Sequence, residues 1–237
     1  MARTITALVA IAIVVGATAA SARAQYYLNP AQVDLVKILA PPPIANSPQG
    51  KADLQAVLDA QRDRTPAAVA SARADAYLSV FRFADVMGPG FTPENLPFTK
   101  QFFARLVVDD ERAIDPAKDH FGRLRPYAAD PEVKPILHPL KSDSYPSGHA
   151  TFAYATAILL AQMVPEKAEA IFARADRFAE NRVIAGVHYP TDIEAGWISA
   201  SVIDNVLFHE PRFETDQARA TAEVRHALGL SPTPPLD

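Results

Sequence analysis

Two histidines in the C-terminal half of the chain have neighbours that could support nucleophilic catalysis. His188 lies between two expected helices, and Asp192 follows it four positions later, at the start of the second helix. A carboxylate that accepts a hydrogen bond from one ring nitrogen leaves the other free to attack, and it stabilises the ring once it is charged. Asp192 also fits a plain first-turn acid that complements the helix dipole, and it could fill both roles.

The second histidine, His149, ends the run Tyr145-Pro146-Ser147-Gly148-His149, directly before an apolar stretch. The first amides of a helix have no partner within the helix and attract anions. Ser147 could cap this helix and donate to an anion, and Gly148 would let the backbone approach closely. His149 would then stand at the mouth of an anion site as a proton donor. Taken alone, the run fits an ordinary helix start with an incidental histidine equally well.

Three basic residues accompany the histidines. Lys118 and Arg125 lie seven positions apart, which would place them on one side of a helix if this segment is helical. Arg182 precedes His188 by six positions. Such cations can neutralise a phosphoryl dianion, and an arginine can grip two of its oxygens at once. By itself, a basic cluster near a proline is more often a solvated surface.

Together, these three clusters resemble the tripartite signature of the PAP2 (phosphatidic acid phosphatase type 2) superfamily. The order and the spacing agree in segments 118–126, 146–149 and 182–192. One position departs from the pattern, because the family usually has serine where this chain has Asn181. Within the superfamily the chain is most similar to the bacterial class A non-specific acid phosphatases, on the evidence of its N-terminus, its length and the 144–149 run.

The resemblance implies hydrolysis of phosphate monoesters through a phosphohistidine, with no metal and no other cofactor. It also implies a homo-oligomer, and a phosphoenzyme could transfer phosphate to other alcohols as a side activity. A nucleophile must be neutral and a general acid protonated, so we expect a mildly acidic pH optimum. The catalytic residues would be His188 as nucleophile, His149 as acid and base, and Asp192 as the group that holds His188, with Lys118, Arg125, Ser147, Gly148 and Arg182 binding the phosphate.

Three other functions use the same residues. A vanadium-dependent haloperoxidase would bind vanadate in the same pocket, but the chain is much shorter than those members of the superfamily. A lipid phosphatase is a second alternative, and the lack of apolar spans beyond residue 24 makes it less favoured. A non-catalytic periplasmic anion-binding protein would need the cations, but not a His–Asp pair beside a second histidine.

Composition excludes several classes of function. The net charge is −4, which argues against binding of a nucleic-acid polymer through phosphate neutralisation. The chain has no cysteine, so thiol catalysis, disulfides and cysteine-based zinc sites are ruled out. No pair of histidines has helical metal-ligand spacing with an acid between them, and no metal site is expected.

The N-terminus has the pattern of a secretory signal peptide. Arg3 precedes an apolar run, and Ala22-Arg23-Ala24 is typical of a cleavage site. We therefore expect a signal peptide at 1–24 and a periplasmic protein with no membrane span after cleavage. A proline-rich segment at 25–50 and a helical phosphatase domain at 51–237 would follow.

Helical periodicity dominates the remainder, and alternating strand patterns are scarce. We expect an all-α protein with a single compact helical domain of the PAP2/haloperoxidase type. The expected helices lie at about 31–39, 51–64, 66–87, 99–114, 147–163, 165–185, 191–208 and 214–228, with a long irregular segment at 115–147.

Overall fold

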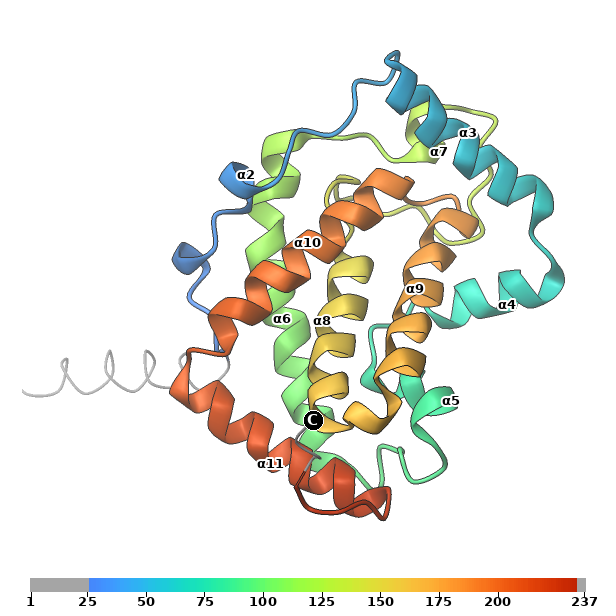
Figure 1. Ribbon diagram of the computed structural model, residues 1–237. Helices are drawn as coiled ribbons and strands as arrows, with labels where there is room; N and C mark the ends of the chain where they lie inside the picture. Colours follow the sequence, from blue (N-terminus) through green and yellow to red (C-terminus); the bar gives the residue numbers. More distant parts are fainter. Residues whose placement is uncertain (1–25, 234–237) are drawn as a thin grey trace, which may run out of the picture.

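The computed structural model describes residues 26–233, and the predicted signal peptide lies outside this range. Within it, every regular element is a helix, which confirms the all-α prediction. The longer helices pack against one another in a single bundle (Figure 1). They are α3 (Pro48–Asp63), α4 (Pro66–Ala74), α6 (Pro97–Phe121), α8 (Gly148–Met163), α9 (Ala168–Ile184), α10 (Pro190–Leu207) and α11 (Pro211–Ala227).

Short helical turns connect or precede these helices. Several begin with a proline, whose fixed φ and missing amide suit the first turn of a helix. The short helical turns are η1 (Pro30–Gln32), α2 (Leu35–Ile38), η2 (Val80–Phe83), α5 (Ala84–Met87), α7 (Pro126–Ala129) and η3 (Pro165–Lys167).

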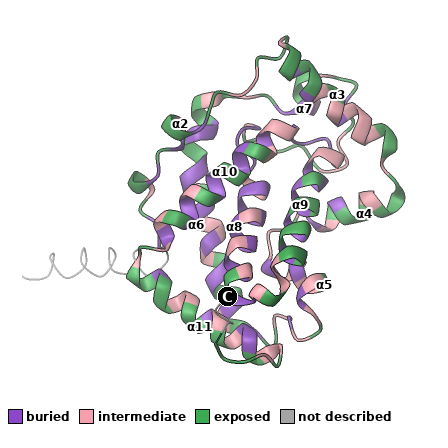
Figure 2. Cartoon of the chain, viewed as in Figure 1, coloured by how far each residue is buried: buried purple, intermediate pink, exposed green. Residues whose placement is uncertain are grey.

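Helix α8 forms the centre of the bundle. Its sequence is apolar on nearly all sides, and such a helix is stable only when other elements cover it. Helices α9 and α10 pack along it most extensively, and α6 also packs against it. Burial follows this arrangement, because α8 is mostly buried whereas α3 and α11 expose one face (Figure 2).

Helices α8 and α10 approach each other closely at the N-terminal end of α8. A β-carbon on Gly196 of α10 would lie 2.7 Å from the β-carbon of Ala150 and 2.8 Å from the carbonyl oxygen of Ser147. Only glycine fits at this contact. The Ser147 amide donates to the carbonyl of Asp192 at 3.0 Å. The close contact therefore holds the second and third sequence clusters side by side.

Three predicted helices differ from the structure. The helix expected at 31–39 is instead two short separate turns, η1 and α2. The helix expected at 66–87 ends at Ala74, because the side chain of Asp75 is held in the interior by residues distant in sequence. The helix expected at 99–114 instead runs from Pro97 to Phe121, so part of the predicted irregular segment is helical. Pro116 lies within this helix without ending it.

Candidate active site

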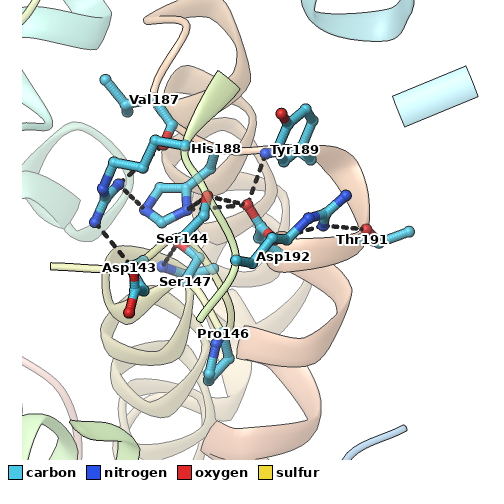
Figure 3. A network of polar contacts seen from close by, with 12 residues as sticks. Asp143, Ser144, Pro146, Ser147, Val187, His188, Tyr189, Thr191 and Asp192 are labelled. Carbon is cyan, nitrogen blue, oxygen red and sulfur yellow. Dashed lines mark hydrogen bonds and ion pairs between the residues drawn. The ribbon is translucent and has the colours of Figure 1, made fainter. Parts of the chain in front are cut away.

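His188 lies in the turn between α9 and α10. Gly186 makes this turn possible with a φ of +72°, a conformation that favours glycine. The Nδ1 atom of His188 is 3.3 Å from Oδ2 of Asp192, which stands in the first turn of α10. Because a carboxylate only accepts, Nδ1 carries the proton and Nε2 keeps a free electron pair. The predicted His–Asp pair is therefore present (Figure 3). Only 1% of His188 is exposed.

Asp192 is itself fixed by several donors. Its Oδ2 accepts from the Ser144 hydroxyl at 2.6 Å and from the Tyr189 amide at 2.8 Å. The second bond caps α10 at Tyr189, so this helix begins at Pro190, one residue before the expected start at 191. Burial alone would raise the pKa of Asp192, but hydrogen bonding to His188 and the nearby positive charges lower it below the ordinary value. Asp192 is accordingly a carboxylate that can hold an imidazole in one orientation.

Arg125 contacts the other ring nitrogen of His188. Its Nη1 lies 3.0 Å from Nε2 of His188 and donates to the carbonyl of Val187 at 2.9 Å. Arg125 stands at the start of α7, after the left-handed end of α6 at Gly122. The segment from Lys118 to Arg125 is therefore not one helix, so the condition under which they would share a helical side is not met, although both reach the same region.

Lys118 belongs to the last turn of α6 and is buried. Its Nζ donates to the carbonyls of Asp143 at 2.8 Å and Pro146 at 2.6 Å, so it holds the loop that leads into α8. Burial and the charge of Arg125 lower the pKa of Lys118 to about 8. The ammonium group is thus close to losing its proton at neutral or mildly alkaline pH.

Arg182 is the third predicted cation, in the last turn of α9, and only 1% of it is exposed. Its Nε and Nη1 atoms are buried and have no hydrogen-bond partner among the described residues. Burial and the charge of Arg125 lower the pKa of Arg182 to about 9. A buried guanidinium with unpaired donors is costly, and an anion would relieve that cost.

Ser147 and Gly148 form the N-terminal end of α8, as predicted. The Ser147 hydroxyl accepts from the Ala150 amide at 3.3 Å and caps the helix. A β-carbon at Gly148 would lie 2.9 Å from Cδ1 of Ile114, so the small residue lets α8 begin close to α6. The first amides of this long helix are suited to an anion.

His149 lies beside Arg182 in a cleft of about 770 Å³. Its Nε2 is 3.1 Å from the carbonyl oxygen of Ala76. Burial, then the charge of Arg182, lower the pKa of His149 well below its ordinary value. The ring is thus neutral when no anion offsets these charges. The cleft is lined by Arg73, Ala76, Tyr77, Pro135, Ile136, Leu137, His138, Leu140, His149 and Arg182.

The predicted residues therefore gather at one end of the bundle. The charges of Lys118 and Arg125 both lower the pKa of His188, and the charge of Arg125 also lowers that of Arg182. Arg125 thus repels both Lys118 and Arg182 in a buried region. A tetrahedral dianion among them would remove that repulsion.

Comparison with known proteins identifies the family of this chain. The PAP2 superfamily model matches residues 106–215. An acid phosphatase of Zymomonas mobilis is 30% identical, over 85% of this chain and 79% of its own length. The chain belongs to the PAP2 superfamily. A non-specific acid phosphatase of Providencia stuartii is 29% identical over 84% of each chain. A crystal structure of a transmembrane PAP2 type phosphatidylglycerolphosphate phosphatase from Bacillus subtilis gives a TM-score of 0.48 at 19% identity, covering 73% of this chain and 89% of that one.

Sequence reasoning missed one cation of this PAP2 site. Arg123 donates to Oδ1 of Asp192 at 2.6 Å and to Oδ2 of Asp53 at 2.7 Å, and thereby links α3 to the His–Asp pair. Its place two residues before Arg125 in the first cluster was a usable signal. Asp53 offered none, because a lone aspartate in an amphipathic helix is usually solvated.

Membrane-spanning helices and metal sites bear on the alternative functions of this PAP2 chain. Among residues 26–233, no helix is both long and apolar enough to cross a bilayer. Over the same range, no three side chains of the metal-binding types come together as a metal site.

Proposed function

We propose that this protein is an acid phosphatase that hydrolyses phosphate monoesters through a phosphohistidine at His188. The observation that carries the proposal is the state of the His188 ring. Its Nδ1 lies against Asp192, which places the ring proton there, and its Nε2 electron pair faces the Arg125 guanidinium at 3.0 Å. The names of the curated relatives, acid phosphatase and non-specific acid phosphatase, support the same reaction.

In the first step, the phosphoryl group of the substrate binds among Lys118, Arg125 and Arg182. Arg125 turns its donors from His188 to the phosphoryl oxygens, which releases the Nε2 electron pair. Nε2 then forms a bond to phosphorus while the bond to the ester oxygen breaks. The departing oxygen keeps that electron pair and receives a proton from His149.

In the second step, water completes the cycle. His149 takes a proton from water, the hydroxide oxygen bonds to phosphorus, and the phosphorus–nitrogen bond breaks with its electrons returning to Nε2 of His188. Asp192 keeps the ring oriented throughout. An alcohol in place of water would give phosphotransfer, which is the side activity that the resemblance implies.

The required protonation states favour acidic pH. Burial lowers the pKa of His188 well below its ordinary value, so the nucleophile stays neutral in mild acid. Because the pKa of His149 is lowered, acidic pH is needed to protonate this ring, and its protonated fraction grows as the pH falls. A bound phosphate dianion offsets Arg182 and raises that fraction further. The mildly acidic optimum is therefore retained as a prediction.

We infer that the three cations, rather than a metal, hold the phosphoryl charge. The test is hydrolysis of p-nitrophenyl phosphate at acidic pH with EDTA present. The expected result is turnover that survives EDTA and falls by several orders of magnitude in His188→Ala, since removal of a nucleophile can cost on the order of 10⁶ in kcat. His226→Ala, which changes an exposed histidine of α11, is the matched control and should keep full activity.

Two outcomes would reject this function. Full activity in His188→Ala would remove the nucleophile from the reaction. Tight binding of inorganic phosphate with no turnover of any monoester would instead indicate an anion-binding protein. Loss of activity in EDTA that added metal restores would reject metal independence alone.

Export and assembly are further parts of the proposal. The signal-peptide pattern at 1–24 supports a periplasmic location, and N-terminal sequencing of the exported protein should begin at Gln25. The resemblance supports a homo-oligomer. Light scattering after size-exclusion chromatography should give a mass above that of one chain.

A further inference from the structure

Asp75 is a fully buried carboxylate that the proposed mechanism does not use. It ends α4, and its Oδ1 accepts from Nη2 of Arg174 at 2.6 Å and from Nε of Arg82 at 2.8 Å. Its Oδ2 accepts from Nδ2 of Asn181 at 2.7 Å. Three donors from two elements, α9 and η2, therefore fix this one side chain and hold the backbone that follows it in place.

The residue after Asp75 contacts the proposed general acid. The carbonyl oxygen of Ala76 lies 3.1 Å from Nε2 of His149. Because a carbonyl only accepts, Nε2 must carry the proton of this hydrogen bond. Nδ1 is then the nitrogen that takes up and releases the catalytic proton. The Ala76 carbonyl thus decides both the tautomer and the orientation of His149.

Asn181 connects this arrangement to the phosphate site. It immediately precedes Arg182 on α9, so a single helical turn contributes a phosphate-binding cation and a ligand for Asp75. The family pattern has serine at this position, and a serine side chain ends one bond closer to the backbone than the amide nitrogen of asparagine. The departure at Asn181 therefore provides a longer reach toward Asp75.

We propose that Asn181 and Asp75 form a positioning pair for the general acid. By fixing Asp75, Asn181 holds the Ala76 carbonyl against Nε2 of His149 and leaves Nδ1 available for the leaving group. Neither member of the pair touches the reacting atoms. The inference rests on the proposed function, in which His149 is the acid.

Substrates whose leaving groups differ in acidity can distinguish a role of Asn181 in positioning His149 from a general effect of Asn181 on protein stability. p-Nitrophenolate departs readily without a proton, whereas an alkoxide needs one from a general acid. Misplacement of His149 should therefore slow hydrolysis of ethyl phosphate much more than hydrolysis of p-nitrophenyl phosphate. A purely structural defect should lower both rates by the same factor.

The experiment measures kcat/KM for both substrates in Asn181→Ala and Asn181→Ser. General acids typically contribute a hundredfold or more, so we expect a partial loss of about tenfold for ethyl phosphate and about twofold or less for p-nitrophenyl phosphate. Ser71→Ala is the matched control. It removes the other acceptor of the Asn181 amide, at 3.0 Å on the exposed side, and leaves the bond to Asp75 intact, so both rates should stay unchanged.

His149→Ala serves as the reference variant. If it shows the selective loss but both Asn181 variants do not, the positioning pair is rejected and the proposed function stands. Equal losses on both substrates in the Asn181 variants also reject the pair. If His149→Ala itself shows no selectivity, the acid role fails, and the positioning pair fails with it.

A second measurement needs no variant with altered packing. Nitrogen NMR of histidine-labelled wild-type protein reports which ring nitrogen carries the proton, with His149→Ala used to assign the signal. We expect the neutral His149 ring to be protonated at Nε2. Protonation at Nδ1 would overturn the inference, because the Ala76 carbonyl could not then accept from the ring.

Discussion

At the scale of single residues, the site is a group of charges held close together at a cost. Lys118 and Arg125 donate to carbonyls of the 142–146 loop, and Arg125 also contacts the nucleophile. Arg182 has buried donors that meet no hydrogen-bond partner within residues 26–233. The side chains of the three cations are therefore fixed in the site. A phosphate that enters forms ion pairs and hydrogen bonds with them, and water does not compete for these interactions.

The lowered pKa of Lys118 predicts the alkaline side of the pH profile. Its pKa of about 8 lies below the ordinary lysine value, so the charge is present at acidic pH and is lost as the pH rises through about 8. Because kcat/KM reports the free enzyme, it should decline above that pH. Lys118→Arg should move the decline to higher pH, since arginine stays charged. A kcat/KM that still rises above about pH 9 would contradict this role.

At the scale of helices, the contact between α8 and α10 sets the geometry of the site. A β-carbon at Gly196 would fall on the backbone of Ser147, so Gly196→Ala must push the two helices apart. Overpacking of this kind typically costs about 1–3 kcal/mol. We expect a loss of unfolding free energy of that size in urea, and a lower kcat because Asp192 moves with α10.

Ser201→Ala is the control for that substitution. It changes an exposed residue of the same helix, and its hydroxyl bonds only to the carbonyl one turn earlier. Stability and activity should therefore stay close to wild type. If Gly196→Ala were equally silent, the close approach of α8 and α10 would not govern the site.

The sequence allowed prediction of helices and of most site residues, because apolar periodicity and local motifs are written in consecutive positions. Prediction from the sequence failed where contacts between residues distant in the chain determine where a helix ends or which side chains join the site. Nothing near Asp75 indicates that Arg174 and Asn181 bury its carboxylate, so the end of α4 was missed. Asp53 was missed for the same reason, since its partner Arg123 lies 70 positions away.

At the scale of the whole molecule, two buried acids connect stability to pH. Asp110 on α6 and Asp204 on α10 are both buried, and neither carboxylate has a hydrogen-bond partner among the described residues. Burial raises the pKa of each well above the ordinary value, and the charge of Asp110 raises that of Asp204 further. The folded protein therefore binds protons here that the unfolded chain releases.

The sign of this linkage gives a prediction. A raised pKa in the folded state contributes stability that is present in acid and is lost as the pH rises toward that pKa. The wild-type protein should thus be more stable at mildly acidic than at alkaline pH. Asp204→Asn, which cannot ionise, should gain about 1 kcal/mol in alkaline solution and less in acid, as measured by urea unfolding. An unchanged pH dependence in this variant would show that the pair does not titrate with folding.

The most direct test of the central claim is capture of the phosphoenzyme. The protein is mixed with a labelled phosphate monoester at acidic pH, quenched within the first turnover in alkali, where phosphohistidine persists, and digested for mass spectrometry. We predict phosphate on the peptide that contains His188, attached to Nε2 and absent from His188→Ala. Label on another residue, or full hydrolysis with no covalent phosphate in a quench that preserves phosphohistidine, would contradict the account.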